Sequence, residues 1–259
     1  MTNILSTRNL QKSYGNTMAL AGVDLDLRSG ESVAIMGASG SGKTTLLHCL
    51  AGIITPDAGM VGFASSRGAQ TISVMRETER SRLRRESFGF VFQQGLLLPE
   101  LTALENVALA LMLGGTPRSQ AENYAQQWLA SLGLAGMEQR RIGELSGGQA
   151  QRVAIARAQV TGASVIFADE PTGALDSQTS GEVMDALLNS TVGLGKTLIL
   201  VTHDAAVAAR CGRLVRLQDG RIISDSAAKP GHSDQQTASQ PQPAQPQTGH
   251  AQPRTTQVA

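Results

Sequence analysis

Apolar and polar residues change their spacing several times along this chain, and each change marks an expected element. Val23, Leu25 and Leu27 alternate with polar residues, which is typical of a half-buried antiparallel strand. Three short, continuous apolar runs predict buried strands: residues 32–36, 164–168 and 197–201. Because helical patterns separate these runs, we expect a mainly parallel sheet that carries functional groups at the carboxyl ends of its strands.

A helix end and a hairpin turn are predicted near the two ends of this α/β pattern. Residues 44–50 predict a helix, which Gly52 and then Pro56 bring to an end. Near the other end of the pattern, residues 213–217 and 221–224 flank the pair Asp219-Gly220, which is a strong β-hairpin signal.

The middle of the chain has a different period. From about residue 101 to 141, apolar residues recur every three or four positions, which predicts helices. We interpret Trp128, the one tryptophan, as a core residue of this stripe rather than as a platform for a ligand. We therefore expect a helical subdomain, at about residues 95–160, inserted into the α/β core. Its stripe consists of Ala121, Tyr124, Ala125, Trp128, Leu129 and Leu132.

Composition divides the chain into two parts. From Asp225 onward the sequence is dominated by Gln, Pro, Ser, Thr and Ala, with too little apolar mass to offset the entropy of ordering. We expect a globular domain at residues 1–224 and a disordered tail at residues 225–259.

Charge and hydropathy narrow the function classes. The 259 residues are 41% apolar and 17% charged with a net charge of +1, so no polycationic surface is indicated. This argues against direct binding of nucleic acid, which needs concentrated basic charge. No apolar run approaches the ~18 residues of a membrane span, and we expect a cytoplasmic protein whose Cys49 and Cys211 are reduced.

Residues 37–44 read GASGSGKT, which fits the phosphate-binding pattern G-x-x-x-x-G-K-[ST]. Glycines allow backbone N–H groups to surround phosphate oxygens, and the lysine adds a positive charge. The expected strand before the motif and helix after it provide the context that this loop requires. The candidate nucleotide-binding residues here are Gly37, Ala38, Ser39, Gly40, Ser41, Gly42, Lys43, Thr44 and Thr45.

Two further motifs handle phosphate chemistry. Residues 145–149 read LSGGQ at the start of a helical stretch, which predicts a second set of N–H donors and a positive helix end. Asp169 and Glu170 end an apolar strand; the alternative to a catalytic role is that this pair caps the following turn.

Together these motifs resemble the ATP-binding subunit of an ABC transporter, over approximately residues 3–224. GASGSGKT, Gln93 in FVFQQ, LSGGQ, FADEP, ALD at 174–176 and VTHD at 201–204 occur in the order of that family. The resemblance implies a P-loop NTPase core with a mainly parallel sheet, an N-terminal antiparallel β subdomain and an inserted α-helical subdomain. It also implies hydrolysis of ATP. The stretch that begins FGFVFQQ is similar to the bacterial lipoprotein-release, macrolide-export and cell-division ATPases.

The resemblance assigns roles to the residues around the phosphates. Lys43 would contact the β- and γ-phosphates, while Thr44 and Asp169 would hold Mg²⁺. Glu170 would act as the general base that polarises the attacking water. His203 would bind the γ-phosphate and position that water, although a lone histidine is more often structural.

Two more side chains complete this assignment. Gln93 would approach both Mg²⁺ and the water. Tyr14 occupies the position at which the family stacks an aromatic ring on adenine, or is a plain surface aromatic.

LSGGQ implies that one chain is insufficient. In the family this element meets the ATP of a second subunit, so two ATP molecules are expected between the two copies of a two-fold homodimer. The residues that would contribute across that interface are Ser146, Gly147, Gly148, Gln149 and Asp176.

An ATP-driven dimer needs a membrane partner to act on. The resemblance implies an integral-membrane permease subunit, with the cassette peripheral on the inner face of the cell membrane. Leu96, Leu97 and Leu98 are either packing residues or part of the contact with that partner. A mechanical ATPase that signals through a membrane partner, as in cell division, is the alternative. ATPases of this type that act on DNA or ribosomes carry a coiled-coil insertion or a second cassette, and neither is present here.

Overall fold

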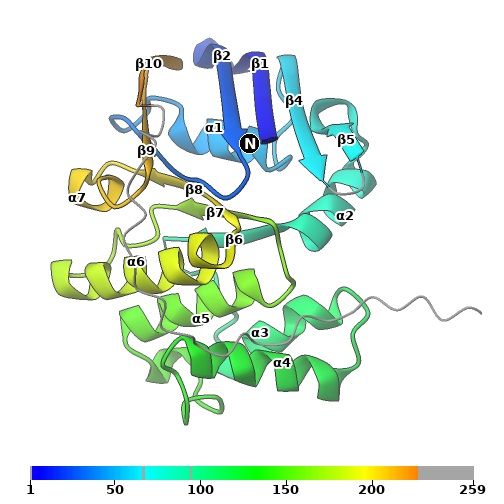
Figure 1. Cartoon of the computed structure of the whole chain (residues 1–259), viewed down its shortest axis with the longest axis vertical. Helices are drawn as coiled ribbons and strands as arrows, with labels where there is room; N and C mark the ends of the chain where they lie inside the picture. Colours follow the sequence, from blue (N-terminus) through cyan, green and yellow to red (C-terminus); the bar gives the residue numbers. More distant parts are fainter. Residues whose placement is uncertain (1, 66–67, 94, 227–259) are drawn as a thin grey trace, which may run out of the picture.

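Two β-sheets and a group of helices make up the computed structural model of the chain, which describes residues 2–65, 68–93 and 95–226. In Figure 1 the smaller sheet lies at the top, the larger sheet below it, and helices α3 to α6 at the bottom. Helices α3 to α5 lie in sequence between two strands of the larger sheet, β6 and β7, so these three helices form an insertion.

The smaller sheet is antiparallel, with strand order β2-β1-β4-β5 among the described residues. Its first two strands pair from Asn3 opposite Arg28 to Tyr14 opposite Thr17. Gly15 takes φ 57° in the tight turn between them, a left-handed conformation that glycine adopts without steric cost. The strands are β1 (Asn3–Tyr14), β2 (Thr17–Arg28), β4 (Ala58–Ser65) and β5 (Gly68–Thr71).

The larger sheet has the order β10-β9-β3-β8-β7-β6 in the described part of the chain. All neighbouring pairs are parallel except β9 and β10, which confirms the expected mainly parallel sheet. The strands are β3 (Ser32–Met36), β6 (Phe88–Phe92), β7 (Val165–Asp169), β8 (Thr197–Thr202), β9 (Arg213–Gln218) and β10 (Arg221–Ser226).

Both faces of the larger sheet are buried, because successive side chains of a strand point to opposite faces. Val33 and Ile35 of β3 pack in a core shared with the smaller sheet and helix α1. Ala34, between them, joins a second core formed with helices α3 to α6. This explains why the strands read as continuous apolar runs rather than as alternating patterns.

Seven α-helices and three short 3-10 turns occur among the described residues. The α-helices are α1 (Lys43–Leu50), α2 (Glu77–Ser87), α3 (Ala103–Met112), α4 (Arg118–Ser131), α5 (Gly147–Gln159), α6 (Ser177–Thr191) and α7 (Ala205–Ala208). The 3-10 turns are η1 (Ile72–Val74), η2 (Ile142–Glu144) and η3 (Val192–Leu194). Trp128 is buried in the core between α4 and its neighbours, as predicted, and Lys196 Nζ lies 5.5 Å from the centre of its ring.

The predicted hairpin around Asp219-Gly220 is confirmed by β9 and β10. Strand β10 continues two residues past the expected end of the globular domain, because Asp225 pairs with the buried Arg213 and the Ser226 hydroxyl bonds the backbone of Leu214. The remainder of the expected tail, residues 227–259, lies outside the described residues.

Candidate functional site

The carboxyl ends of three parallel strands meet at one edge of the larger sheet. In register, Met36 of β3 lies beside Thr202 of β8, and Val201 lies beside Asp169 of β7. A cavity of about 620 Å³ opens at this edge, between the phosphate loop, α1 and the end of β1. Its described lining residues are Tyr14, Thr17, Ala19, Ser39, Gly40, Gly42, Lys43, Thr44, Thr45, Glu170 and His203.

The phosphate loop depends on glycine at two positions for different reasons. Gly42 caps the start of α1 with φ 99°, and a Cβ there would lie 2.2 Å from the carbonyl oxygen of Ala19. Gly37 has ordinary backbone angles, but its Cβ would lie 2.2 Å from the carbonyl oxygen of Leu217. Any side chain at either position would push the loop off the sheet, so the loop is fixed by close backbone contacts.

Lys43 already lies in place for an anion. Its side chain is buried, and Nζ donates to the carbonyl oxygens of Gly37 and Ala38, both at 2.9 Å. These two bonds fold the lysine back along its own loop, so the ammonium is held beside the loop backbone. A polyphosphate in the cavity would meet this charge at the N-terminus of α1.

The two adjacent acids at the end of β7 have different partners. Asp169 Oδ1 accepts a hydrogen bond from Thr44 Oγ1 at 3.2 Å. Glu170 Oε1 lies 2.8 Å from His203 Nδ1, and Glu170 Oε2 accepts from Thr202 Oγ1 at 3.3 Å. One carboxylate is therefore turned toward α1 and the other toward the strand that carries the histidine.

Backbone geometry separates the two carboxylates. Glu170 has φ 48°, in the left-handed region that a side chain occupies at a cost of about 1 kcal/mol or more. Its N–H nevertheless continues the sheet, donating to Val201 O at 2.9 Å. The left-handed turn swings the Glu170 side chain away from Asp169 and into the cavity.

The residues present fit a bound magnesium ion. Mg²⁺ takes oxygen ligands and keeps several waters or phosphate oxygens, and the Thr44–Asp169 pair offers a hydroxyl and a carboxylate. Withdrawal from solvent raises the pKa of the Asp169 carboxyl, and the Thr44 hydrogen bond opposes that rise. No group of three or more His, Cys, Asp or Glu side chains that could hold a metal ion gathers within the described ranges.

The remaining residues of the loop face a neighbouring space. Gly37, Ala38 and Ser41 line a cavity of about 570 Å³ on the β9 side of the loop, together with Arg216 and Asp219. Tyr14 lines the main cavity at the end of β1 and is half-exposed, so a planar ligand could stack on its ring.

LSGGQ lies apart from the cavity. Ser146 caps α5: its hydroxyl accepts from the N–H of Gln149, whose side chain accepts from the N–H of Ser146. None of residues 146–149 lines the cavity around Lys43. The structure therefore does not bring the two phosphate motifs of one chain together.

Asp176 lies next to LSGGQ. It caps α6 by accepting from the N–H groups of Gln178 and Thr179 and from the Thr179 hydroxyl, which lowers the pKa of its carboxyl. A Cβ at Gly148 would lie 2.4 Å from Thr179 Cγ2, so Gly148 lets α5 pack tightly against α6. LSGGQ and the ALD segment thus form one surface, although the sequence separates them.

Gln93 lies in the loop after β6 and is exposed. A Cβ at Gly173 would lie 2.9 Å from Gln93 Nε2, so the glutamine side chain rests against the turn that follows Glu170. Gln93 does not line the cavity. Of the expected catalytic residues, Glu170 and His203 are in direct contact. Gln93 instead lies against the turn that follows Glu170.

Sequence reasoning missed three contributors to this site. Thr17 and Ala19 line the cavity, and the Thr202 hydroxyl bonds Glu170. Thr202 lies within the VTHD motif and could have been found there. Ala19 acts through its carbonyl group against Gly42, a contact for which the side-chain pattern carries no signal.

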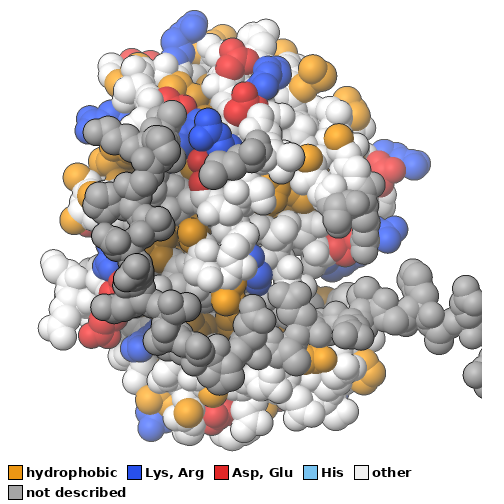
Figure 2. All heavy atoms as spheres, in the orientation of Figure 1, with side chains coloured by type: hydrophobic (Ala, Val, Ile, Leu, Met, Phe, Trp, Pro, Cys, Tyr) orange, Lys and Arg blue, Asp and Glu red, His pale blue; other side chains and the backbone are white. Residues whose placement is uncertain are grey.

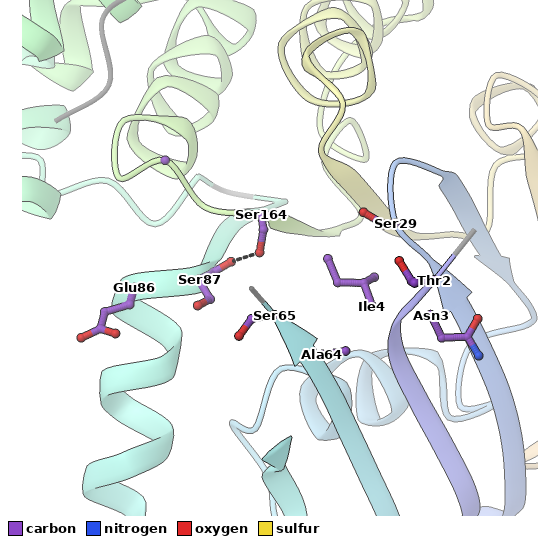
Figure 3. A pocket seen from close by; sticks show the side chains of 10 residues that line it. Thr2, Asn3, Ile4, Ser29, Ala64, Ser65, Glu86, Ser87 and Ser164 are labelled. Atoms are coloured by element: carbon purple, nitrogen blue, oxygen red, sulfur yellow. Dashed lines mark hydrogen bonds between the residues drawn. The ribbon is translucent and has the colours of Figure 1, made fainter. Parts of the chain in front are cut away.

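A second cavity, of about 650 Å³, has a different chemistry (Figure 3). It lies at the amino ends of the strands, where Ser164 precedes β7 and its hydroxyl donates to Ser87 O at 3.3 Å. Its described lining is mostly small and polar, and Glu86 is the one charged side chain in it.

The surface of the molecule bears on which partners it could bind. On the face in Figure 2, Lys and Arg side chains stand singly or beside Asp and Glu, rather than as a continuous basic patch. Leu96 and Leu98 are 59% and 44% exposed, whereas Leu97 packs against the helical core. Within residues 2–65, 68–93 and 95–226, no helix has the length and apolar character needed to cross a membrane.

A family model described as "ABC transporter" matches residues 20–173, more than half of the chain. The pyoverdine export ATP-binding/permease protein PvdT of Pseudomonas fluorescens is 46% identical over 231 residues, which are 87% of this chain and 34% of that protein. The macrolide export ATP-binding/permease protein MacB of Nitrosomonas europaea is 43% identical over 243 residues, 92% of this chain and 35% of that protein. The chain spans about a third of the length of these curated relatives.

Solved structures show the same fold. The dimeric structure of a post-hydrolysis state of the ATP-binding cassette MJ0796 bound to ADP and Pi superposes with a TM-score of 0.77 at 37% identity. That match covers 87% of this chain and 99% of the solved chain. The structure of cbiO1 from Clostridium perfringens, part of the ABC transporter complex cbiONQ, gives a TM-score of 0.77 at 28% identity and covers 87% of this chain and 88% of that one.

Proposed function

The chain belongs to the ABC transporter family as an ATP-hydrolysing cassette, and from this premise we propose that it drives a membrane permease of exporter type through ATP-dependent closure of a homodimer. The two named relatives are export proteins, which favours export over a signalling role in cell division. The substrate that crosses the membrane is set by the permease, so the cassette itself carries no specificity for it.

The observation that carries this proposal is that the two adjacent acids have different hydrogen-bond partners. Asp169 is bonded to Thr44 on the side of α1, and Glu170 is bonded to His203 on the side of β8. A γ-phosphate placed at Lys43 would have a metal-binding side chain on one flank and a base on the other. This arrangement suits attack by water on the terminal phosphorus.

The chain's own residues then perform hydrolysis in one displacement. Glu170 accepts a proton from water while the water oxygen bonds to the γ-phosphorus. The bond from that phosphorus to the β–γ bridging oxygen breaks, and the electron pair leaves with ADP. His203 holds Glu170 in place through their 2.8 Å contact and would bind the γ-phosphate and position the water.

Thr44, Asp169 and Gln93 would hold Mg²⁺, and Tyr14 would stack on the adenine. When bound, Mg²⁺ neutralises charge on the phosphate oxygens and holds them in line for attack. Within this chain, Lys43 supplies the fixed positive charge and α1 supplies its N-terminus, so the phosphates are oriented before the metal site is complete.

Residues 146–149 act in trans in this proposal. Ser146, Gly147, Gly148 and Gln149 of one copy complete the phosphate site of the other, with Asp176 of the same surface beside them. Two observations support it: these residues do not line their own chain's cavity, and the similar cassette MJ0796 was solved as a dimer bound to ADP and Pi. Opening and closing of the two copies is the mechanical output.

The domain assignment and location follow from the same role. We assign residues 1–224 to the cassette, with the helical subdomain at about residues 95–160, and place the protein at the inner face of the membrane. The exposed Leu96 and Leu98 offer an apolar contact for a permease segment. No nucleic acid takes part.

The test is the variant Glu170→Gln. Removing the base should slow ATP hydrolysis by roughly 10²- to 10⁴-fold while leaving ATP binding intact, so dimers should accumulate in ATP. Sedimentation velocity or size exclusion with light scattering measures the dimer. Glu122→Gln, on the surface of α4 and paired with Arg118, is the matched control that should behave as wild type. A Glu170→Gln protein that stays monomeric in saturating ATP would contradict the proposal.

A further inference from the structure

The loop that carries Gln93 is tied to the inserted helices through its backbone. We define the Gln93 loop as residues 93–98, of which Gln94 lies outside the described part. Gln151 of α5 donates from Nε2 to the carbonyl oxygen of Phe92 at 2.9 Å, in the last residue of β6 just before the loop. Arg157 of α5 donates to the carbonyl oxygens of Leu96 at 2.7 Å and Gly95 at 2.6 Å.

The two carbonyls that meet Arg157 are aimed by an unusual turn. Gly95 has φ 67° and Leu96 has φ 47°, so both lie in the left-handed region. Glycine accepts this freely, but leucine does so at a cost of about 1–2 kcal/mol. The turn directs both oxygens to a single guanidinium, whose planar fork can donate to two acceptors at once. A lysine ammonium has no such geometry.

Arg157 has no acidic partner to account for its position. Among the described residues no acidic side chain contributes to the pKa shift of its guanidinium, which burial lowers. A guanidinium stays charged in proteins, so this side chain carries a partly desolvated charge compensated by carbonyl oxygens. The free-energy cost of desolvating the guanidinium is offset only when its hydrogen bonds to the carbonyl oxygens of Gly95 and Leu96 are made.

A third anchor comes from α3. Asn106, with 1% of its surface exposed, accepts from the N–H of Leu98 at 2.8 Å and donates to Leu98 O at 3.0 Å. The side-chain anchors described here, Gln151, Arg157 and Asn106, therefore all belong to the helical insertion. If the helices turn relative to the sheets, Arg157 and Asn106 would move residues 95–98 with them, while Gln151 holds the end of β6.

We propose that Arg157 is a positioning residue that sets the location of Gln93 relative to the nucleotide by clamping the carbonyl groups of Gly95 and Leu96. Helix α5 begins at Ser146 and carries Arg157 eleven residues later, about 16 Å along a rigid helix. When Ser146 docks on the twin's nucleotide, the same helix moves Gln93. The proposal rests on the proposed function, because it assigns Gln93 a part in hydrolysis.

The test is Arg157→Lys, which keeps the charge and loses the paired donors. The maximal rate of ATP hydrolysis should fall about tenfold or more, since misplacing a positioning group by an ångström costs up to about 10²-fold, while KM for ATP changes less than about twofold. Hydrogen exchange should become faster at the amides of Gly95 and Leu98 and stay unchanged in β7.

Arg84→Lys is the matched control. Arg84 also donates from its guanidinium to a backbone carbonyl, Gly52 O at 2.6 Å, at the end of α1 remote from the phosphate loop. This variant should keep wild-type kcat and wild-type exchange in the Gln93 loop. A drop in kcat of the same size would show that any lost carbonyl contact has this effect, and would overturn the proposal.

Two safeguards keep the test decisive. If Arg157→Lys does not fold, Gln151→Leu removes the anchor at Phe92 from the same helix and should also lower kcat without raising KM. Gln93→Ala tests the proposed function separately. If this variant hydrolyses ATP at the wild-type rate, Gln93 has no role in hydrolysis. The clamp is then tested only by the hydrogen exchange of the Gly95 amide. Unchanged exchange and unchanged kcat in Arg157→Lys would refute the clamp.

Discussion

The phosphate loop and the LSGGQ surface differ in how far one chain completes them. Around the loop, Lys43 bonds two carbonyls, Thr44 bonds Asp169, and Glu170 bonds His203. At LSGGQ the hydrogen bonds of Ser146 and Gln149 are confined to their own helix cap, and residues 146–149 do not line the cavity around Lys43.

This difference indicates that one chain carries a complete phosphate loop, whereas its LSGGQ surface is only part of a phosphate site. The loop is built to bind a nucleotide without help, because its charges and donors already have fixed positions. Residues 146–149 present a helix N-terminus and small residues on the surface, which can bind only a phosphate that another molecule carries. We propose that a second copy of the chain carries this phosphate. Three substitutions test the contrast between the two regions.

The largest effect is expected from Lys43→Ala. It removes the positive charge that the phosphate loop holds against the nucleotide, so ATP binding and hydrolysis should both fall, hydrolysis by about 10²- to 10³-fold or more. ATP titration by calorimetry and a phosphate-release assay measure the two losses. Arg8→Ala, which breaks an exposed pair with Asp26 in the smaller sheet, should leave both unchanged. Retained ATP affinity in Lys43→Ala would show that the loop is not the primary binding site.

A loss confined to hydrolysis is expected from Ser146→Arg. The bulky cation blocks the LSGGQ surface, so the rate should fall about 10²-fold while one chain still binds ATP with near wild-type affinity. Losing the Ser146 cap also lowers the free energy of unfolding by about 1 kcal/mol. The control Ser131→Arg places the same side chain at the exposed end of α4 and should keep full activity. Loss of ATP binding in Ser146→Arg would remove the distinction between the two regions.

The smallest effect concerns stability. Desolvation raises the pKa of Asp169 above its ordinary value of 3.8, so the ionised carboxylate destabilises the metal-free fold as pH rises through the folded-state pKa. Asp169→Asn should therefore melt at a slightly higher temperature than wild type at pH 7, and the difference should shrink toward pH 4. Adding Mg²⁺ with ATP should stabilise wild type more than the variant, as read by calorimetry. A lower melting temperature for Asp169→Asn at pH 7 would contradict the desolvation argument.

Much of this could be predicted because it depends on local sequence. Strands β3, β7 and β8 follow from short apolar runs, α1 from the motif that starts it, and the β9–β10 hairpin from Asp219-Gly220. Trp128 was interpreted as core from its position on a helical stripe, and it is buried. These features are fixed by side-chain periodicity and turn chemistry, which a sequence displays directly.

Other features depend on contacts between distant segments. The left-handed backbone of Glu170 and Leu96, the packing of Gly148 against Thr179 and the burial of Arg157 have no local signature. Leu96, Leu97 and Leu98 could not be divided from sequence, because a run of three leucines does not say which one faces the core. In the structure the middle one is partly buried against the helical core, and Leu96 and Leu98 are exposed.

The most direct measurement mixes the two inactive chains, Lys43→Ala and Ser146→Arg. In a mixed dimer both defects fall on one composite site and leave the other intact, so an equal mixture should recover about a quarter of wild-type ATPase activity. Each variant alone should stay inactive. If the mixture is as inactive as its components, the phosphate loop and residues 146–149 do not act across two chains, and the account is wrong.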